Sequence, residues 1–137
     1  MDPDQARIDD TRAWVVRARE DAATARDLLE LPSPRLRPAL FFCQQSVEKV
    51  LKALLAWHDV SFPKTHNLAV LSAQCLRLVP ALGAVLPKAH DLTVYAWRFR
   101  YPGSPQEPDL DEARSALAVT QDVLEAVLEH LPESVRP

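Results

Sequence analysis

Two arginines beside a rigid loop are the residues best suited to bind an anion. Arg98 and Arg100 flank Phe99, and Tyr101 opens a segment, residues 101–108, that contains three prolines and one glycine. Such a segment predicts a stiff, non-helical loop. Because a guanidinium group binds phosphate oxygens in pairs, Arg98, Arg100 and Tyr101 are candidate phosphate-binding residues. The alternative is that arginines at the end of a helix only stabilise its dipole.

A second set of candidates lies on the helix expected at residues 37–58. Gln45, Glu48, Lys49 and Lys52 recur at i, i+3, i+4 and i+7, so they form one polar stripe. The stripe is either a solvated face or one wall of a groove shared with a partner or ligand. As a solvated face, it would hold a Glu48–Lys52 pair that contributes only about 0.2–0.5 kcal/mol.

His66 and Asp91 complete the set of candidate ligand-binding residues. His66 follows Thr65 in the connector expected at residues 61–67, and it either fixes that connector by hydrogen bonding or contacts a ligand. Asp91 precedes Tyr95 by four residues. It is either simply exposed, or its carboxylate orients an arginine or His66.

Motifs of the common enzyme classes are absent from the chain. There is no glycine-rich phosphate loop, no His-Glu-x-x-His and no Gly-x-Ser-x-Gly. The only cysteines, Cys43 and Cys75, lie on apolar helical stripes without ligand-spaced partners. We expect two buried free thiols, no metal site and no cofactor.

Charge is distributed unevenly along the chain, although the net charge is only −3. Residues 35–101 carry nine basic side chains against three acidic ones, whereas both flanks are acidic. This pattern indicates either internal charge balance or a cationic groove for a phosphate-bearing partner. No apolar run approaches a membrane span, and the start Met-Asp-Pro-Asp lacks the basic character of a signal peptide, so we expect a cytoplasmic protein that does not bind membranes.

The elements that must position these residues are predicted to be helices. The chain has 137 residues, 47% of them hydrophobic, with two glycines and twelve prolines, which disfavours hairpin-rich β folds. Between the prolines, apolar residues recur at helical spacing. We expect five helices, at about residues 10–31, 37–58, 68–78, 80 or 87 to 99, and 109–131. Short connections predict one all-α, up-and-down bundle.

Caps and core positions follow from the same patterns. Thr65 or Asn67 is expected to cap the third helix, and Asp109 with Glu112 has capping-box spacing at the start of the last. The predicted core includes Cys43, Val47, Leu51, Leu71, Cys75, Leu92 and Leu124. Five aromatic residues either join this core or leave enough apolar surface for a dimer: Trp14, Phe41, Phe42, Trp57 and Trp97.

Three motifs in this order resemble the HEPN domain family (higher eukaryotes and prokaryotes nucleotide-binding). They are Phe-x-Gln-Gln-Ser-x-Glu-Lys-x-Leu-Lys-Ala-Leu at residues 42–54, Pro-x-Thr-His-x-Leu at 63–68, and Arg-Tyr-Pro at 100–102. The resemblance covers about residues 12–131 and implies a single HEPN-like helical domain over residues 1–137. It also implies a homodimer and association with a small nucleotidyltransferase protein, as in toxin–antitoxin systems, or with nucleotides or RNA.

The chain departs from the pattern of the family's metal-independent ribonucleases. Those members carry Arg-x(4–6)-His, but no histidine follows Arg98 or Arg100 at that spacing. We therefore expect a nucleotide- or RNA-binding or interaction module rather than an enzyme. The alternatives are a ribonuclease toxin with a degenerate site, using Arg100 with His66 or Tyr101, and a purely structural dimerisation module.

Overall fold

Four α-helices and three 3-10 helices make up the parts of the chain that the computed structural model describes, residues 2–99, 102–103 and 107–137. The α-helices are α1 (Pro3–Glu30), α2 (Leu36–Trp57), α3 (Leu68–Leu78) and α4 (Leu110–Leu128). The 3-10 helices are η1 (Pro80–Ala84), η2 (Leu86–Ala96) and η3 (Glu133–Val135). These described residues contain no strand, so the predicted all-α bundle is confirmed.

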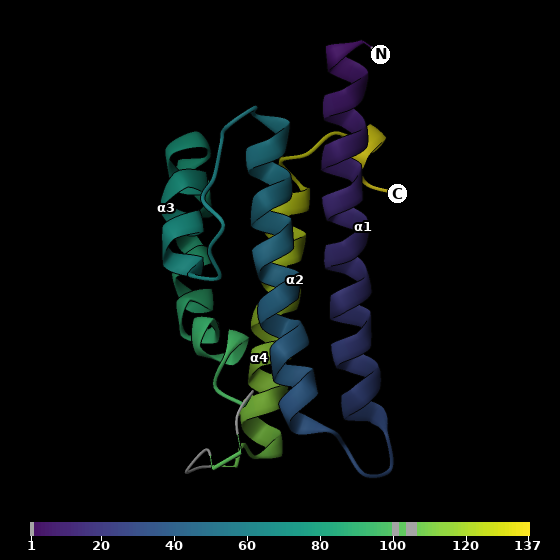
Figure 1. The fold of residues 1–137 in the computed structure, drawn as a ribbon, viewed down its shortest axis with the longest axis vertical. Helices are drawn as coiled ribbons and strands as arrows, with labels where there is room; N and C mark the ends of the chain where they lie inside the picture. Colours follow the sequence, from purple (N-terminus) through teal and green to yellow (C-terminus); the bar gives the residue numbers. More distant parts are fainter. Residues whose placement is uncertain (1, 100–101, 104–106) are drawn as a thin grey trace.

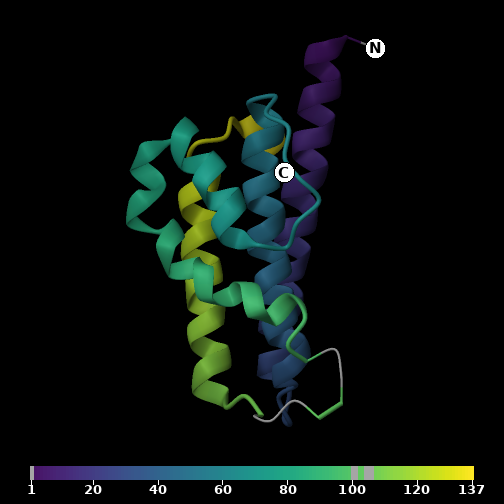
Figure 2. The same ribbon diagram turned by 60° about the vertical axis from the view of Figure 1, so that its left-hand side comes forward.

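The central helix of the bundle is α2, which packs against α1, α3, η2 and α4 (Figure 1). α1 and α2 form an antiparallel pair joined by a short turn, and α1 extends beyond the other helices at its N-terminal end (Figure 1). The segment η2 crosses the bundle on the side of α3 (Figure 2). Consequently, a side chain on α2 can meet α1, α4 or the η2 segment according to the direction in which it points.

The connector between α2 and α3 runs back along α2 instead of leaving the bundle. The Nε2 atom of Gln44 donates to the carbonyl oxygen of His66 at 3.1 Å. Trp14 of α1 meets Phe62 of the connector edge to face, with ring centroids 6.2 Å apart. The connector therefore brings His66 to the middle of α2.

The predicted core is confirmed. All seven expected positions are buried, with Leu124 the most exposed of them at 8%. Asn67 caps α3 by accepting from the Ala69 amide at 3.0 Å, and Asp109 caps α4 by accepting from the Glu112 amide at 2.8 Å. Thr65 instead accepts from the amide of Asn67 at 3.1 Å.

Two predicted helices differ from the observed elements. The first begins at Pro3, seven residues earlier than expected, because Asp2 caps it and proline suits a first turn. The expected helix of residues 80–99 is instead the 3-10 pair η1 and η2. Pro87 has no N–H to donate, and its ring would clash with the carbonyl of the residue four before it, so a continuous α-helix is broken there.

No helix in the described ranges is both long and apolar enough to cross a membrane.

Candidate functional site

The polar stripe on α2 is not a solvated face at Glu48 and Lys52, whose side chains are 4% and 10% exposed. The Glu48 carboxylate accepts from Lys52 Nζ at 3.1 Å and from Gln44 Nε2 at 3.1 Å, and its Oε1 lies 2.7 Å from His66 Nδ1. Burying an ion pair is costly unless further hydrogen bonds satisfy it, and these contacts satisfy Glu48. Of the two alternatives, the solvated face therefore does not hold for these two residues.

The Lys52 ammonium group is enclosed by aromatic rings as well as by Glu48. It lies 5.5 Å from the ring centroid of Trp14 and 5.6 Å from that of Phe62. Both distances are within the range of cation–π attraction. Lys52 therefore joins α1, α2 and the connector.

His66 combines an anchored ring nitrogen with an exposed ring. Its side chain is 64% exposed, although Nδ1 contacts the buried Glu48. The Nδ1 atom is thus the ring nitrogen that faces the carboxylate, which accepts a hydrogen bond in the tautomer with Nδ1 protonated. His66 thus fixes the connector by hydrogen bonding, which is one of the two alternatives that the sequence offered for it. Most of its ring remains accessible.

The other members of the predicted stripe point elsewhere. Lys49 Nζ lies 2.5 Å from Oδ2 of Asp21 on α1, in a mostly buried pair. Gln45 Nε2 donates to the side-chain oxygen of Gln44 at 2.7 Å. The stripe therefore stabilises contacts of α2 with α1 and the connector.

Arg98 lies at a different interface, between the end of η2 and α4. Its Nη1 is 3.5 Å from Oε1 of Glu112, and the same oxygen accepts from the Tyr95 hydroxyl at 3.0 Å. Asp91 is exposed on η2 and, among the described residues, forms no ion pair with Arg98 or His66. The predicted candidates Arg100 and Tyr101 lie outside the described residues.

The structure thus brings Glu48, Lys52 and His66 together, whereas Lys49 and Arg98 face different helices. Lys49 reaches α1, and Arg98 reaches α4. Each of the candidate cations Lys49, Lys52 and Arg98 has a carboxylate partner.

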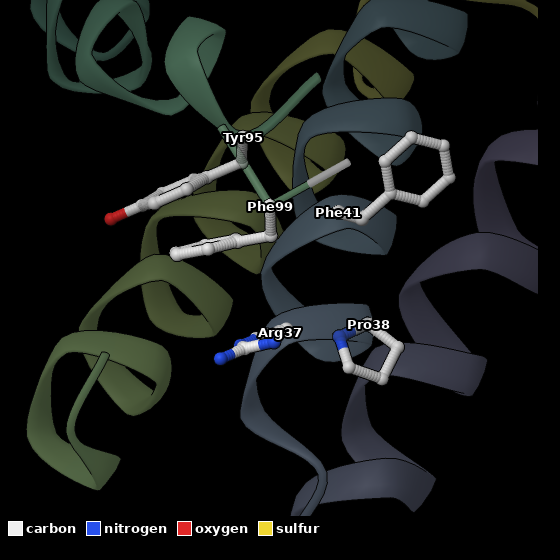
Figure 3. Close-up of a pocket in the computed structure, with 5 residues that line it drawn as sticks. All are labelled: Arg37, Pro38, Phe41, Tyr95 and Phe99. Atoms are coloured by element: carbon white, nitrogen blue, oxygen red, sulfur yellow. The ribbon is translucent and has the colours of Figure 1, made fainter. Parts of the chain in front are cut away.

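An open cavity of about 290 Å³ lies between the first turns of α2 and the end of the η2 segment. Arg37, Pro38 and Phe41 line it from α2, and Tyr95 and Phe99 line it from the other side. Figure 3 shows the Tyr95 and Phe99 rings one above the other, with Arg37 close to Phe99. The two rings are nearly parallel, at 12°, with centroids 6.1 Å apart. This cavity offers flat aromatic faces next to a cation.

Tyr95 is held as a neutral phenol. Burial raises its pKa to about 12, and the hydrogen bond to Glu112 acts in the same direction. The hydroxyl therefore remains a donor to Glu112, which fixes the ring at the edge of the cavity.

Most of the cavity was not predicted from the sequence. Phe41 was expected only as a core or interface residue, and Arg37, Pro38 and Phe99 were not candidates. The i,i+4 spacing of Arg37 and Phe41 places them on one helix face and could have indicated half of the cavity. The other half depends on how η2 crosses α2, for which the sequence offers no local signal.

The described residues contain no group of three or more metal-ligating side chains. Cys43 and Cys75 are both fully buried free thiols. Burial raises their pKa values to about 11 and 12, so neither is a reactive thiolate near neutral pH.

The all-α bundle built around α2 places this chain in the class of helical-bundle proteins. The family model described as "HEPN domain" matches residues 11–131. The chain therefore belongs to the HEPN domain family, which supports a nucleotide- or RNA-related module in general terms. Searches of curated proteins and of solved structures each found no significant match.

Proposed function

We propose that this chain is a HEPN module that binds a nucleotide or RNA, forms a homodimer and acts with a small nucleotidyltransferase protein, as in toxin–antitoxin systems. The observation that carries the binding function is the cavity lined by Arg37, Phe41, Tyr95 and Phe99. The dimer and the nucleotidyltransferase partner rest on the family resemblance.

The lining of the cavity suits a nucleobase. Aromatic side chains stack on bases without strong sequence preference, and removing one such ring costs about 1–3 kcal/mol of binding free energy. Tyr95 is buried and held in orientation by its bond to Glu112, so it supports the half-buried Phe99 ring on which a base would stack. A base on this wall would leave its sugar and phosphate near Arg37.

The arginine segment of residues 98–101 adjoins the cavity in sequence, because Phe99 separates Arg98 from Arg100. We propose Arg98, Arg100 and Tyr101 as further ligand contacts. Lys49, Lys52, Gln45, His66 and Asp91 were also candidate ligand contacts. The ion pairs of Lys49 and Lys52 favour a ligand position at the cavity rather than along the stripe.

Binding assays with single-ring deletions test this function. Phe99→Ala should weaken binding of a mononucleotide or a short RNA by about 1–3 kcal/mol. Val70→Ala is the control, because Val70 is an exposed apolar residue on α3, at 40% exposure, and is not among the residues that line the cavity. Equal losses in the two variants, or none in Phe99→Ala, would contradict a base site in the cavity.

Arg100→Ala tests the adjoining segment. We expect it to weaken binding by about 1.5–3 kcal/mol, the range for a charge-assisted hydrogen bond, with little change in Tm. Affinity should also fall with added salt, because phosphate binding releases counterions. A large loss of Tm with unchanged affinity would assign Arg100 to the stability of the loop.

A pull-down followed by mass spectrometry tests the partner. Tagged protein expressed in its native cells should retain a small nucleotidyltransferase protein. Recovery of the chain without any such protein would count against this part of the proposal.

A ribonuclease is the second candidate, favoured by His66. An exposed imidazole oriented by a buried carboxylate resembles a general base, which RNA transesterification requires. Single-stranded RNA incubated with purified protein and a chelator separates the two functions. The binding module leaves the RNA intact, whereas a ribonuclease cuts it and loses the activity in His66→Ala.

A further inference from the structure

Arg37 holds a carboxylate at the edge of the cavity. Its Nε donates to Oε2 of Glu107 at 2.9 Å, and its Nη2 pairs with Oε1, so the contact is two-pronged. Glu107 is seventy residues away in the sequence and directly precedes Pro108 and the α4 cap Asp109. The pair therefore ties the first turn of α2 to the approach to α4.

The Arg37–Glu107 ion pair is well placed to exchange the Glu107 carboxylate for another anion. The Arg37 and Glu107 side chains are 50% and 65% exposed, and exposed ion pairs contribute little net stability. By contrast, Lys49, Lys52 and Arg98 pair with carboxylates through side chains that are 10–26% exposed. Among these pairs, the guanidinium group of Arg37 is the easiest to release to an incoming anion.

A phosphate can take the same position as the Glu107 carboxylate. Both groups present two oxygens to the fork of a guanidinium group, but a terminal phosphate carries nearly two negative charges at neutral pH. Arg37 lies in the first turn of α2, where the positive end of the helix dipole also favours an anion. Phosphate should therefore compete successfully with Glu107 for Arg37.

We propose that Arg37 is a subsite for a terminal phosphate and that Glu107 occupies it in the free protein. The ligand is one nucleotide unit with its base on the Tyr95–Phe99 wall and its phosphate on Arg37. The cavity volume, about 290 Å³, lies just below the roughly 300–1,000 Å³ typical of small-ligand sites, which limits the ligand to about one nucleotide unit. This inference rests on the proposed function and names the ligand group that the cavity selects.

Calorimetric titration of the full chain tests the subsite with four probes. They are adenosine 5′-monophosphate, adenosine, and an adenosine trinucleotide of RNA with or without a 5′-phosphate. In the wild-type chain, each phosphorylated probe should bind about ten-fold or more tightly than its unphosphorylated counterpart. The trinucleotide pair shows whether the phosphate comes from a free nucleotide or from an RNA end.

Three variants complete the test. Arg37→Ala should remove the advantage of the phosphorylated probes. Glu107→Gln should tighten their binding by about two- to five-fold, because the competing charge is lost. Glu125 is an exposed glutamate on α4, and Glu125→Gln removes one negative charge at a site other than the Arg37 pair. This variant should change neither the affinity for the phosphorylated probes nor their advantage over the unphosphorylated ones.

The outcomes separate this inference from the function on which it rests. Phosphate-independent binding that is still lost in Phe99→Ala would overturn the Arg37 subsite and leave the base site standing. A phosphate advantage that Glu107→Gln does not increase, or that Glu125→Gln increases equally, would overturn the role of Glu107. Absence of binding by all four probes would contradict the proposed function itself.

Discussion

Glu48 makes several contacts at the centre of the bundle and joins α2 to the connector. Its buried carboxylate contacts Lys52 on the same helix, Gln44 one turn earlier and His66 on the connector. Because Lys52 and Gln44 are buried, loss of the carboxylate leaves Lys52 as a buried charge without its ion-pair partner. The HEPN-like motif of residues 42–54 therefore has a structural role in this chain at Gln44, Glu48 and Lys52.

The first prediction concerns this cluster. Glu48→Gln should lower the free energy of unfolding by about 3 kcal/mol, the lower end for removing one partner of a buried ion pair. Urea denaturation followed by circular dichroism measures it. Asp27→Asn, in an exposed pair with Arg26, is the control and should cost less than about 0.5 kcal/mol. Similar losses in both variants would contradict the role assigned to Glu48.

The second prediction concerns Tyr95 and alkaline pH. Its pKa is raised to about 12 in the folded chain, above the usual value of 10, so the folded state holds this proton more tightly than the unfolded state. The resulting stability is fully present below about pH 10 and is lost as the pH rises toward 12.

Comparison with Tyr95→Phe isolates this effect. Between about pH 9 and pH 11, the wild-type chain should lose about 1 kcal/mol more stability than the variant. Cys43 and Cys75 titrate in a similar range but are present in both proteins, so their contributions cancel. Equal pH dependence of stability in the two proteins would show that folding does not raise the pKa of Tyr95.

Among the helices, the caps of α3 and α4 are where sequence and structure agree most closely. Asp109 and Asn67 have the side chains that accept from exposed backbone amides, and both form the expected caps. Apolar periodicity likewise identified α2, α3 and α4 and their buried faces. These features are local, so a single sequence contains enough information to predict them.

The third prediction tests the cap of α4. Asp109→Ala should destabilise the chain by about 1 kcal/mol, the usual cost of losing an N-cap. Asp122→Asn, on an exposed position within α4, should have almost no effect in the same urea denaturation experiment. If Asp109→Ala is equally neutral, the Asp109–Glu112 contact does not stabilise α4.

The η2 segment shows where local reasoning fails. Pro87 accounts for the end of a continuous α-helix, but residues 88–96 contain no signal that distinguishes a 3-10 helix from an α-helix. Leu68 donates its amide to the Thr93 hydroxyl at 3.1 Å, and Tyr95 bonds to α4, so tertiary contacts position this segment. The cavity could not be predicted for the same reason, since Tyr95 and Phe99 reach α2 only through the course of η2.

At the scale of the whole molecule, most of the aromatic residues considered for a dimer pack within one chain. Trp14, Phe42 and Trp57 lie against the core, whereas Trp97 is 57% exposed. The polar stripe on α2 also contains buried residues, and their burial depends on contacts with α1 and the connector. Sequence patterns identified these side chains, but the surface they share depends on the assembled bundle.

The fourth prediction is a homodimer. Sedimentation equilibrium at micromolar concentration should give twice the 15.4 kDa mass of the chain, with the exposed Trp97 as a candidate contact. Trp97→Ser should then shift the equilibrium toward the monomer without loss of helicity. A wild-type mass near that of one chain would contradict the dimer.

The cavity between α2 and the η2 segment is the place where we expect a nucleotide unit to bind. Amide chemical-shift mapping by NMR, with adenosine 5′-monophosphate added to the labelled chain, tests it most directly. Binding in the cavity predicts saturable shifts concentrated at Arg37, Phe41, Tyr95 and Phe99. Shifts concentrated instead around Lys49, Lys52 and His66, or no saturable shifts at all, would contradict it.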